Sequence, residues 1–250
     1  LKYNIHNKIL NLLPSDLRSQ IVKTIDFPPQ NLEYSTTFKS IIDYQLVALK
    51  DNGNDNPLII FPGFSEETFV KNFKQIINYP KKSELFDMFT SIYIFNFSSI
   101  GPKSEGIKIP NVMQNDYNIP MFVTYGLIRN YINNNILNIF NNYTILATSA
   151  GAGIALAIGL NNSNVKGIYF SCPGYSDDDK ELFELLEKAP TDIPIKMTWA
   201  KDDTKIPLDD DKKGAKNIND ILSSKSNYQY IELDKGGHII HNELLDSIIN

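Results

Sequence analysis

The strongest constraint on the fold is an apolar segment, residues 143–148, that runs directly into a serine between small residues. The pentapeptide at positions 147–151 reads Ala-Thr-Ser-Ala-Gly, and a helical stretch, residues 154–160, follows it. Small residues are required where a strand and the following helix nearly touch. The pattern predicts a buried strand, a strained turn that lifts the Ser149 hydroxyl clear of a sheet, and a helix. The alternative is an ordinary N-cap serine at the start of a small-residue helix.

Strand and helix patterns alternate around this turn. Short apolar or alternating runs predict further strands at residues 57–61, 91–97, 165–170, 193–199 and 228–233. Such alternation is typical of an α/β fold with a mostly parallel, doubly wound sheet flanked by helices. At 250 residues with 42% hydrophobic content, the chain is expected to form one domain over residues 1–250.

The first part of the chain carries different patterns. Residues 1–31 have near-helical apolar spacing, broken by Pro14, and predict an N-terminal helical lead-in. Residues 32–49 alternate and are rich in β-branched residues, which predicts an antiparallel hairpin ahead of the parallel strands.

Two intervals set what can cover the sheet edge. About 20 residues separate the strands at 165–170 and 193–199, far fewer than an inserted domain needs, so no large cap domain is expected there. Residues 98–120 are irregular and proline-containing, which fits either a wall of a pocket or a passive surface loop.

Composition limits the partners. The net charge of −5 and the isoelectric point near 5.3 disfavour nucleic acid, because phosphate binding needs clustered Lys and Arg. The longest stretch without charged or large polar residues, residues 147–160, is too short to span a bilayer. The single cysteine, Cys172, cannot form an internal disulfide and fits a buried apolar position in a reducing, cytoplasmic protein. The chain begins at Leu1, which leaves a removed leader open.

Three complementary residue types follow three separate strands. Ser149 follows the strand at 143–148, the pair Asp202 and Asp203 follows residues 193–199, and His238 follows the strand at 228–233 after two glycines. Because the carboxyl ends of parallel strands meet at one edge of a sheet, we expect these side chains to lie together.

A second acidic run occurs at residues 177–179. Acidic residues in the first turn of a helix are favoured by the helix dipole, so this run is expected to begin a helix rather than to bind a metal ion. No metal ion and no cofactor are expected.

The order of serine, aspartate and histidine along the chain, each after a strand, resembles the pattern of the α/β-hydrolase fold superfamily over roughly residues 32–250. Residues 58–64 (Leu-Ile-Ile-Phe-Pro-Gly-Phe) look like the family's oxyanion strand, although Pro62 replaces the usual histidine. The family's acid lies four residues before a proline, which here is Pro207 and selects Asp203 over Asp202. The Gly-Gly-His loop selects His238 over His241, and Ala147 replaces the commoner first glycine of the serine motif.

The resemblance implies a serine hydrolase that cleaves a small carboxylic ester through an acyl-enzyme. Ser149 would attack the carbonyl, His238 would act as base and Asp203 would orient the imidazole. Backbone N–H groups of Phe64 and Ala150 would bind the oxyanion.

Several alternatives stay open. The same three residues cleave thioesters, amides and lipids in proteins of this fold, and a catalytically silent binding protein is the alternative from another class. The sequence does not set the natural substrate or the oligomeric state.

Overall fold

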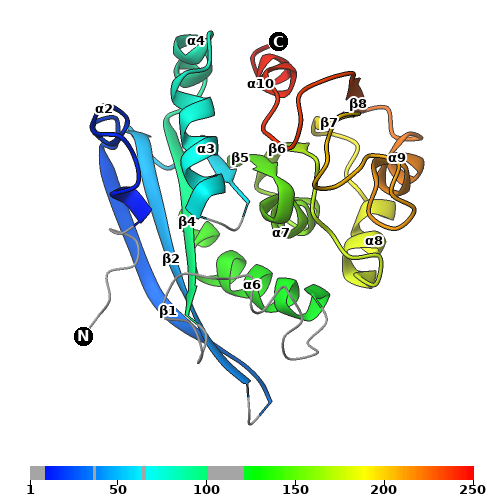
Figure 1. The fold of residues 1–250 in the computed structure, drawn as a ribbon, viewed down its shortest axis with the longest axis horizontal. Coiled ribbons are helices and arrows are strands. Elements are labelled where there is room, and N and C mark those ends of the chain that lie inside the picture. The colour runs from blue at the N-terminus through cyan, green and yellow to red at the C-terminus, as the bar shows by residue number, and fades with distance from the viewer. Residues whose placement is uncertain (1–8, 36–37, 64–65, 101–120) are drawn as a thin grey trace.

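The computed structural model describes residues 9–35, 38–63, 66–100 and 121–250, and the strands of these residues form an eight-stranded sheet (Figure 1). The strands are β1 (Lys23–Ser35), β2 (Phe38–Asp51), β3 (Pro57–Phe61), β4 (Ser91–Ile100), β5 (Tyr143–Thr148), β6 (Val165–Ser171), β7 (Ile195–Ala200) and β8 (Tyr228–Leu233). The helices are α2 (Ser15–Arg18), α3 (Glu66–Ile77), α4 (Lys82–Asp87), α6 (Met121–Asn135), α7 (Ser149–Leu160), α8 (Lys180–Glu187), α9 (Ala215–Leu222) and α10 (Asn242–Ile249), with a 3₁₀ helix at Leu137–Ile139.

The strand order is β1-β2-β4-β3-β5-β6-β7-β8. β1 pairs with β2 and β2 with β4 in antiparallel fashion, whereas the pairs from β4 through β8 are parallel. The chain moves outward from β3 to β4 and then returns past β3 to β5, so the winding reverses between β3 and β5. Open α/β sheets bind ligands at such a switch point, beyond the carboxyl ends of the strands. The order confirms the expected mostly parallel, doubly wound sheet.

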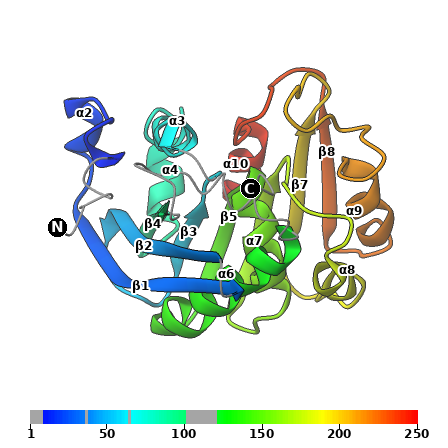
Figure 2. The ribbon, with the colours of Figure 1, turned by 60° about the horizontal axis from the view of Figure 1, so that its bottom comes forward.

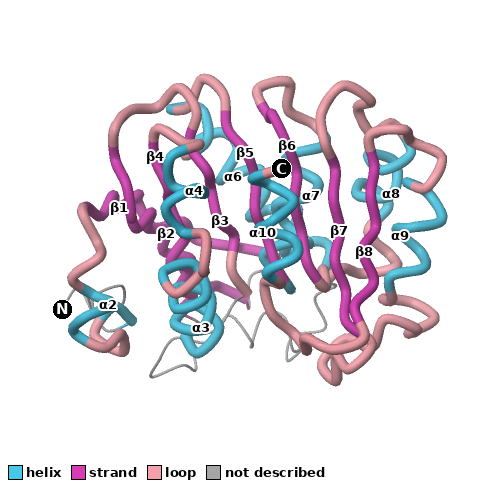
Figure 3. Tube along the Cα trace, turned by 90° about the horizontal axis from the view of Figure 1, so that it is seen from above, coloured by secondary structure: helices cyan, strands magenta, loops and turns pink. Residues whose placement is uncertain are grey.

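Helices cover both faces of this sheet (Figure 3). α3, α4 and α10 lie on one face, and α6, α7, α8 and α9 lie on the other. Alternate residues of β3 serve the two faces: Leu58 and Ile60 belong to the core that includes α3 and α10, and Ile59 and Phe61 belong to the core that includes α6 and α7. Because both faces are covered, β3 is a continuous apolar run rather than an alternating one.

The chain between β6 and β7 forms α8 and its connecting loops (Figure 2). As expected, no large cap domain is inserted at this point. None of the described helices combines the length and the apolar content that crossing a membrane requires.

The predicted helical lead-in over residues 1–31 is present in part: α2 forms directly after Pro14, but the range does not stay helical to residue 31. In the described part of that range β1 already begins at Lys23, so the antiparallel hairpin starts earlier than expected (Figure 1). Ile25 and Phe27 pack against the core, and a register shift after Phe27 accommodates the prolines that begin at Pro28. Pairing along β2 therefore outweighs the weak local signals on which the prediction rested.

Three further helical features differ from the sequence-based expectation. The apolar spacing of residues 121–140 predicts one helix over the whole range, but α6 ends at Asn135 and is followed by the 3₁₀ helix. α4 and α9 have no counterpart among the predicted elements. Both are short, and each is held by apolar residues that are fully buried: Leu85 in α4, and Ile218 and Leu222 in α9.

The acidic run at residues 177–179 directly precedes α8 rather than forming its first turn, and Asp179 is the N-cap of the helix. The Asp179 carboxylate accepts a hydrogen bond from the Leu182 backbone N–H at 3.1 Å and so caps the helix. Asp179 also forms a buried ion pair with Arg129, whose Nη2 lies 2.6 Å from Asp179 Oδ2. The same Nη2 donates to the Gly153 carbonyl oxygen at 2.6 Å. These contacts tie α6, α7 and α8 together.

Two glycines let α7 approach its neighbours closely. A Cβ atom at Gly151 would lie 2.2 Å from the Pro62 carbonyl oxygen, and one at Gly153 would lie 1.8 Å from the Gly174 carbonyl oxygen. Both distances are shorter than any real carbon–oxygen contact, and both obstacles are backbone atoms that cannot rotate away. The start of α7 is therefore pressed directly against two loops.

This packing predicts opposite effects for two Gly-to-Ala substitutions in helices. Gly153→Ala should lower the free energy of unfolding by about 1–3 kcal/mol, because the added methyl group displaces backbone. Gly126→Ala, in α6, should leave it unchanged or raise it by up to about 1 kcal/mol, because a Cβ there meets no atom within 4 Å. Urea unfolding followed by circular dichroism measures both. Equal effects of the two substitutions would contradict the close approach at Gly153.

Candidate active site

Ser149 lies at a sharp turn between β5 and α7. Its φ angle is 54°, in the left-handed region that residues other than glycine rarely adopt. Among the described non-glycine residues, this region is shared only with Cys172, at φ 35°. The N-cap of α7 is Thr148, so Ser149 is not an ordinary N-cap serine. The strained strand-to-helix turn expected from residues 147–151 is present.

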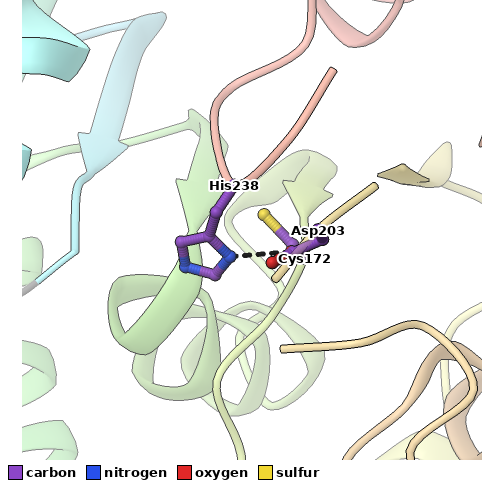
Figure 4. A group of neighbouring side chains, drawn as sticks. All are labelled: Cys172, Asp203 and His238. Carbon is purple, nitrogen blue, oxygen red and sulfur yellow. Dashed lines mark hydrogen bonds and ion pairs between the residues drawn. The ribbon is translucent and has the colours of Figure 1, made fainter. Parts of the chain in front are cut away.

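The structure brings the three sequence-predicted side chains together in one hydrogen-bonded chain. The Oγ atom of Ser149 lies 2.7 Å from Nε2 of His238. Nδ1 of His238 lies 2.8 Å from Oδ2 of Asp203, which Figure 4 shows. The Asp203 side chain is fully buried and the His238 side chain is 10% exposed. Residues from the start of α7 and from the loops after β7 and β8 thus meet at one edge of the sheet.

The Asp203 carboxylate is held from two sides. Its Oδ1 accepts backbone N–H groups of Lys205 and Ile206, both at 2.9 Å, while Oδ2 faces His238. Burial raises the pKa of Asp203, but the bonds to His238 and to these N–H groups outweigh burial and lower it. The carboxylate is therefore ionised at neutral pH.

Neighbouring residues that the sequence left as alternatives take different positions. Asp202 accepts the backbone N–H of Gly237 at 2.7 Å, so it binds the loop that carries His238 and not the imidazole. His241 is buried, with Nδ1 2.8 Å from Thr198 Oγ1 and Nε2 3.1 Å from the Gly237 carbonyl oxygen. Because a carbonyl oxygen only accepts, Nε2 of His241 carries the proton.

Opposing effects act on the His238 pKa. Burial lowers the pKa of His238, but hydrogen bonds and charge from Asp203 and Cys172 outweigh burial and raise it to about 9. A folded-state pKa above the ordinary value of 6.5 means that the protonated imidazole stabilises the fold. This contribution is fully present below pH 6.5 and is lost as the pH rises through about 9.

Sequence analysis missed two residues at the end of β6 that brace the site. Ser171 Oγ donates to the Ile239 carbonyl oxygen at 2.8 Å, directly after His238, and lies 2.9 Å from Thr148 Oγ1, directly before Ser149. Cys172 Sγ lies 3.6 Å from Thr148 Oγ1 and 3.7 Å from the Ile239 carbonyl oxygen. The sequence feature that could have identified them is their position at the carboxyl end of β6, the strand next to β5.

The structure describes one of the two predicted oxyanion donors, Ala150. Ala150 is the second residue of α7, so its N–H belongs to the first turn, where N–H groups lack a partner within the helix. Phe64 lies outside the described residues, as do residues 101–120 of the expected pocket wall. Gly63, just before Phe64, does reach the turn: a Cβ atom there would lie 3.3 Å from the Ser149 Cβ.

One group of side chains at this edge has the donors to hold a metal ion. Cys172, Asp203 and His238 each offer one ligand atom, and these atoms lie within 4.8 Å of one another (Figure 4). The group consists of the predicted acid and base together with the cysteine at the end of β6.

The imidazole of His238 should titrate with a pKa of about 9, and Asp203→Asn should lower this pKa, because the charge that favours the protonated ring is removed. NMR titration of the histidine C–H signals measures both values, with His238→Gln used to assign the signal. Asp202→Asn is the matched control and should change the pKa far less. A wild-type value at or below 6.5 would contradict the proposed balance of burial and charge.

The comparisons with known proteins agree with this geometry at the level of the fold. No family model and no curated protein sequence matches the chain. Solved structures do match. An esterase from Pyrococcus furiosus superposes with a TM-score of 0.52 at 12% identity, over 94% of this chain and 89% of that one. A cold-adapted esterase from an Arctic intertidal metagenomic library gives 0.52 at 9% identity, over 89% and 96%. With its sheet order and its turn at Ser149, this likeness shows that the chain has the α/β-hydrolase fold.

Proposed function

We propose that the protein is a serine hydrolase that cleaves a small carboxylic ester through an acyl-enzyme, with Ser149 as nucleophile, His238 as base and Asp203 as orienting acid. The observation that carries the proposal is the continuous chain of hydrogen bonds, 2.7 Å and 2.8 Å long, that ends on a serine in a left-handed turn. Backbone strain of this kind persists at sites where the surrounding structure maintains it for a function.

In the first half of the reaction, Ser149 Oγ attacks the ester carbonyl while Nε2 of His238 takes the hydroxyl proton. The new C–O bond pushes the carbonyl electron pair onto oxygen. When this pair returns, the alcohol leaves with the proton from His238, and the acyl group stays on Ser149. In the second half, water attacks the acyl carbonyl, His238 takes a proton from that water, and Ser149 is released with the proton returned to it.

Asp203 acts through the imidazole. Nδ1 of His238 can keep its proton only while an acceptor faces it, and Oδ2 of Asp203 is that acceptor at 2.8 Å. In the neutral form of His238, which predominates above its pKa of about 9, Nε2 is unprotonated and can accept the proton of Ser149. The same carboxylate stabilises the imidazolium that forms during attack, which agrees with its effect on the pKa of His238.

The oxyanion requires donors that are fixed before the reaction begins. The backbone N–H of Ala150 is part of the first turn of α7, where the helix dipole also favours negative charge. We propose Phe64 as the second donor, because a Cβ atom at Gly63, directly before it, would lie 3.3 Å from the Ser149 Cβ.

An ester is favoured over a thioester, an amide or a long-chain lipid for two reasons. Two structural neighbours that match most of both chains are described as esterases. The chain between β6 and β7 inserts no cap domain that could enclose a long acyl group. A catalytically silent binding protein would not require Ser149, His238 and Asp203 to be joined by hydrogen bonds.

A fluorophosphonate probe should label the wild-type protein at Ser149, because the probe reacts with an activated serine hydroxyl whatever the natural substrate is. Ser149→Ala should abolish both labelling and hydrolysis of p-nitrophenyl acetate, and should leave the fold intact. Ser223→Ala removes an exposed hydroxyl at the end of α9 and should change neither result. Labelling that persists in Ser149→Ala would exclude Ser149 as the nucleophile.

Asp203→Asn should lower kcat by roughly 10⁴, the effect expected when the histidine loses the acceptor that sets its tautomer. Asp202→Asn should cost far less, because an amide oxygen can still accept the Gly237 N–H. Both variants are assayed with p-nitrophenyl acetate at saturating concentration. The reverse order of the two losses would show that Asp202 is the acid.

A further inference from the structure

The sulfur of Cys172 lies in the group formed by the proposed acid and base (Figure 4). Cys172 follows β6 with a φ of 35°, and its N–H donates to the Thr198 carbonyl oxygen at 3.0 Å, which ties it to β7. The side chain is fully buried. Backbone and burial together therefore fix the direction of this thiol.

The sulfur is only weakly engaged by its other neighbours. Its contacts to Thr148 Oγ1 and to the Ile239 carbonyl oxygen are 3.6 Å and 3.7 Å long. A thiol is a weak hydrogen-bond donor and acceptor, whereas a thiolate is a strong ligand for zinc. Little binding energy is therefore lost if this sulfur turns to a metal ion.

We propose that Cys172, Asp203 and His238 form a binding site for a thiophilic divalent cation, for which Zn²⁺ is the probe. Sulfur, imidazole nitrogen and carboxylate oxygen are the three donor types that bind Zn²⁺ in proteins. One ligand atom from each residue lies within 4.8 Å of the others. Three protein ligands leave a fourth tetrahedral position for water.

The charges of this set balance inside the buried edge of the sheet. A thiolate and a carboxylate carry two negative charges, and neutral imidazole adds none, so the bound divalent ion leaves no net charge. Such compensation is what a buried charge requires. Binding releases the thiol proton of Cys172 to solvent and, where the imidazole of His238 is protonated, one imidazole proton as well, since only the thiolate and the neutral imidazole are metal ligands.

The distances require one hydrogen bond to open. Zinc bonds of about 2.0–2.2 Å to nitrogen and oxygen place those two atoms roughly 3.3 Å apart in a tetrahedron. Nδ1 of His238 and Oδ2 of Asp203 are now 2.8 Å apart. Ligation at Nδ1 therefore replaces the hydrogen bond to Asp203, and ligation at Nε2 replaces the one to Ser149.

Either mode removes the base from the proposed reaction, so the cation is an inhibitor and not a cofactor. This inhibitory consequence rests on the proposed function, whereas binding of the cation does not. The two parts are therefore tested separately.

Binding is tested with Co²⁺ on the full-length Ser149→Ala variant, which needs no activity. Because Cys172 is the chain's single cysteine, a thiolate-to-cobalt charge-transfer band can arise only from Cys172. The band should appear on titration, disappear when Zn²⁺ displaces Co²⁺, and be absent when Cys172→Ala or Cys172→Ser is added to the same background. Asp209→Asn removes an exposed carboxylate outside the group and should keep the band.

Inhibition is tested on the active enzyme with p-nitrophenyl acetate, each variant being compared with its own rate in EDTA. Zn²⁺ should inhibit the wild type, and EDTA should restore the rate. Cys172→Ala should raise the Zn²⁺ concentration for half-inhibition by more than the roughly 10- to 100-fold that loss of an outer-shell partner costs. Cys172→Ser should have the same effect. Using both variants keeps the test decisive if one of them folds poorly.

The outcomes separate the two proposals. Absence of the cobalt band in Ser149→Ala overturns the metal site, whatever the enzyme hydrolyses. If Ser149→Ala shows the cobalt band but the wild type neither hydrolyses p-nitrophenyl acetate nor reacts with the fluorophosphonate, the metal site is supported and the proposed function is overturned. Equal Zn²⁺ inhibition of the wild type and both Cys172 variants overturns the assignment of the ligand.

Discussion

The left-handed backbone at Ser149 requires support from the structure around it. A non-glycine residue with a φ of 54° costs about 1–3 kcal/mol, so neighbouring contacts have to hold the turn in place. The Ser149 carbonyl oxygen accepts the Gly174 N–H at 2.7 Å, and α7 presses against the Pro62 and Gly174 carbonyl groups at positions where only glycine fits. The strands on both sides of β5 thus contribute the loops that hold the half-buried Ser149 in place.

The loops after β7 and β8 are joined by further hydrogen bonds besides the one between Asp203 and His238. Asp203 holds the imidazole of His238, while Asp202 holds the N–H and His241 the carbonyl oxygen of Gly237 just before it. The peptide groups of Gly237 and Ile239, on either side of His238, are therefore held by side chains from the loop after β7, from the N-cap of α10 and from the end of β6. The imidazole keeps its position because its backbone is fixed as firmly as its ring.

Much of the site could be predicted from the sequence, because its strongest signals are local. The small residues at 147–151 predicted the turn, and the spacing to Pro207 favoured Asp203, which the structure places against His238. The first strand and the position of Cys172 could not be predicted. β1 depends on pairing with β2, and the sulfur reaches the acid and base only because β6 lies between β5 and β7 in the sheet. Contacts of this kind are set by strand order, which no short motif contains.

The strand order also places the two parts of the proposed site in regions of the sheet that differ in burial. β8 lies at the edge of the sheet, pairs with β7, and is only partly buried (Figure 2). The loop that carries His238 follows this edge strand, whereas Ser149 follows β5 in the centre. Edge elements with few buried contacts open more readily than the centre of a sheet. Local opening of this edge would therefore separate His238 from Ser149 while the centre of the sheet stays folded.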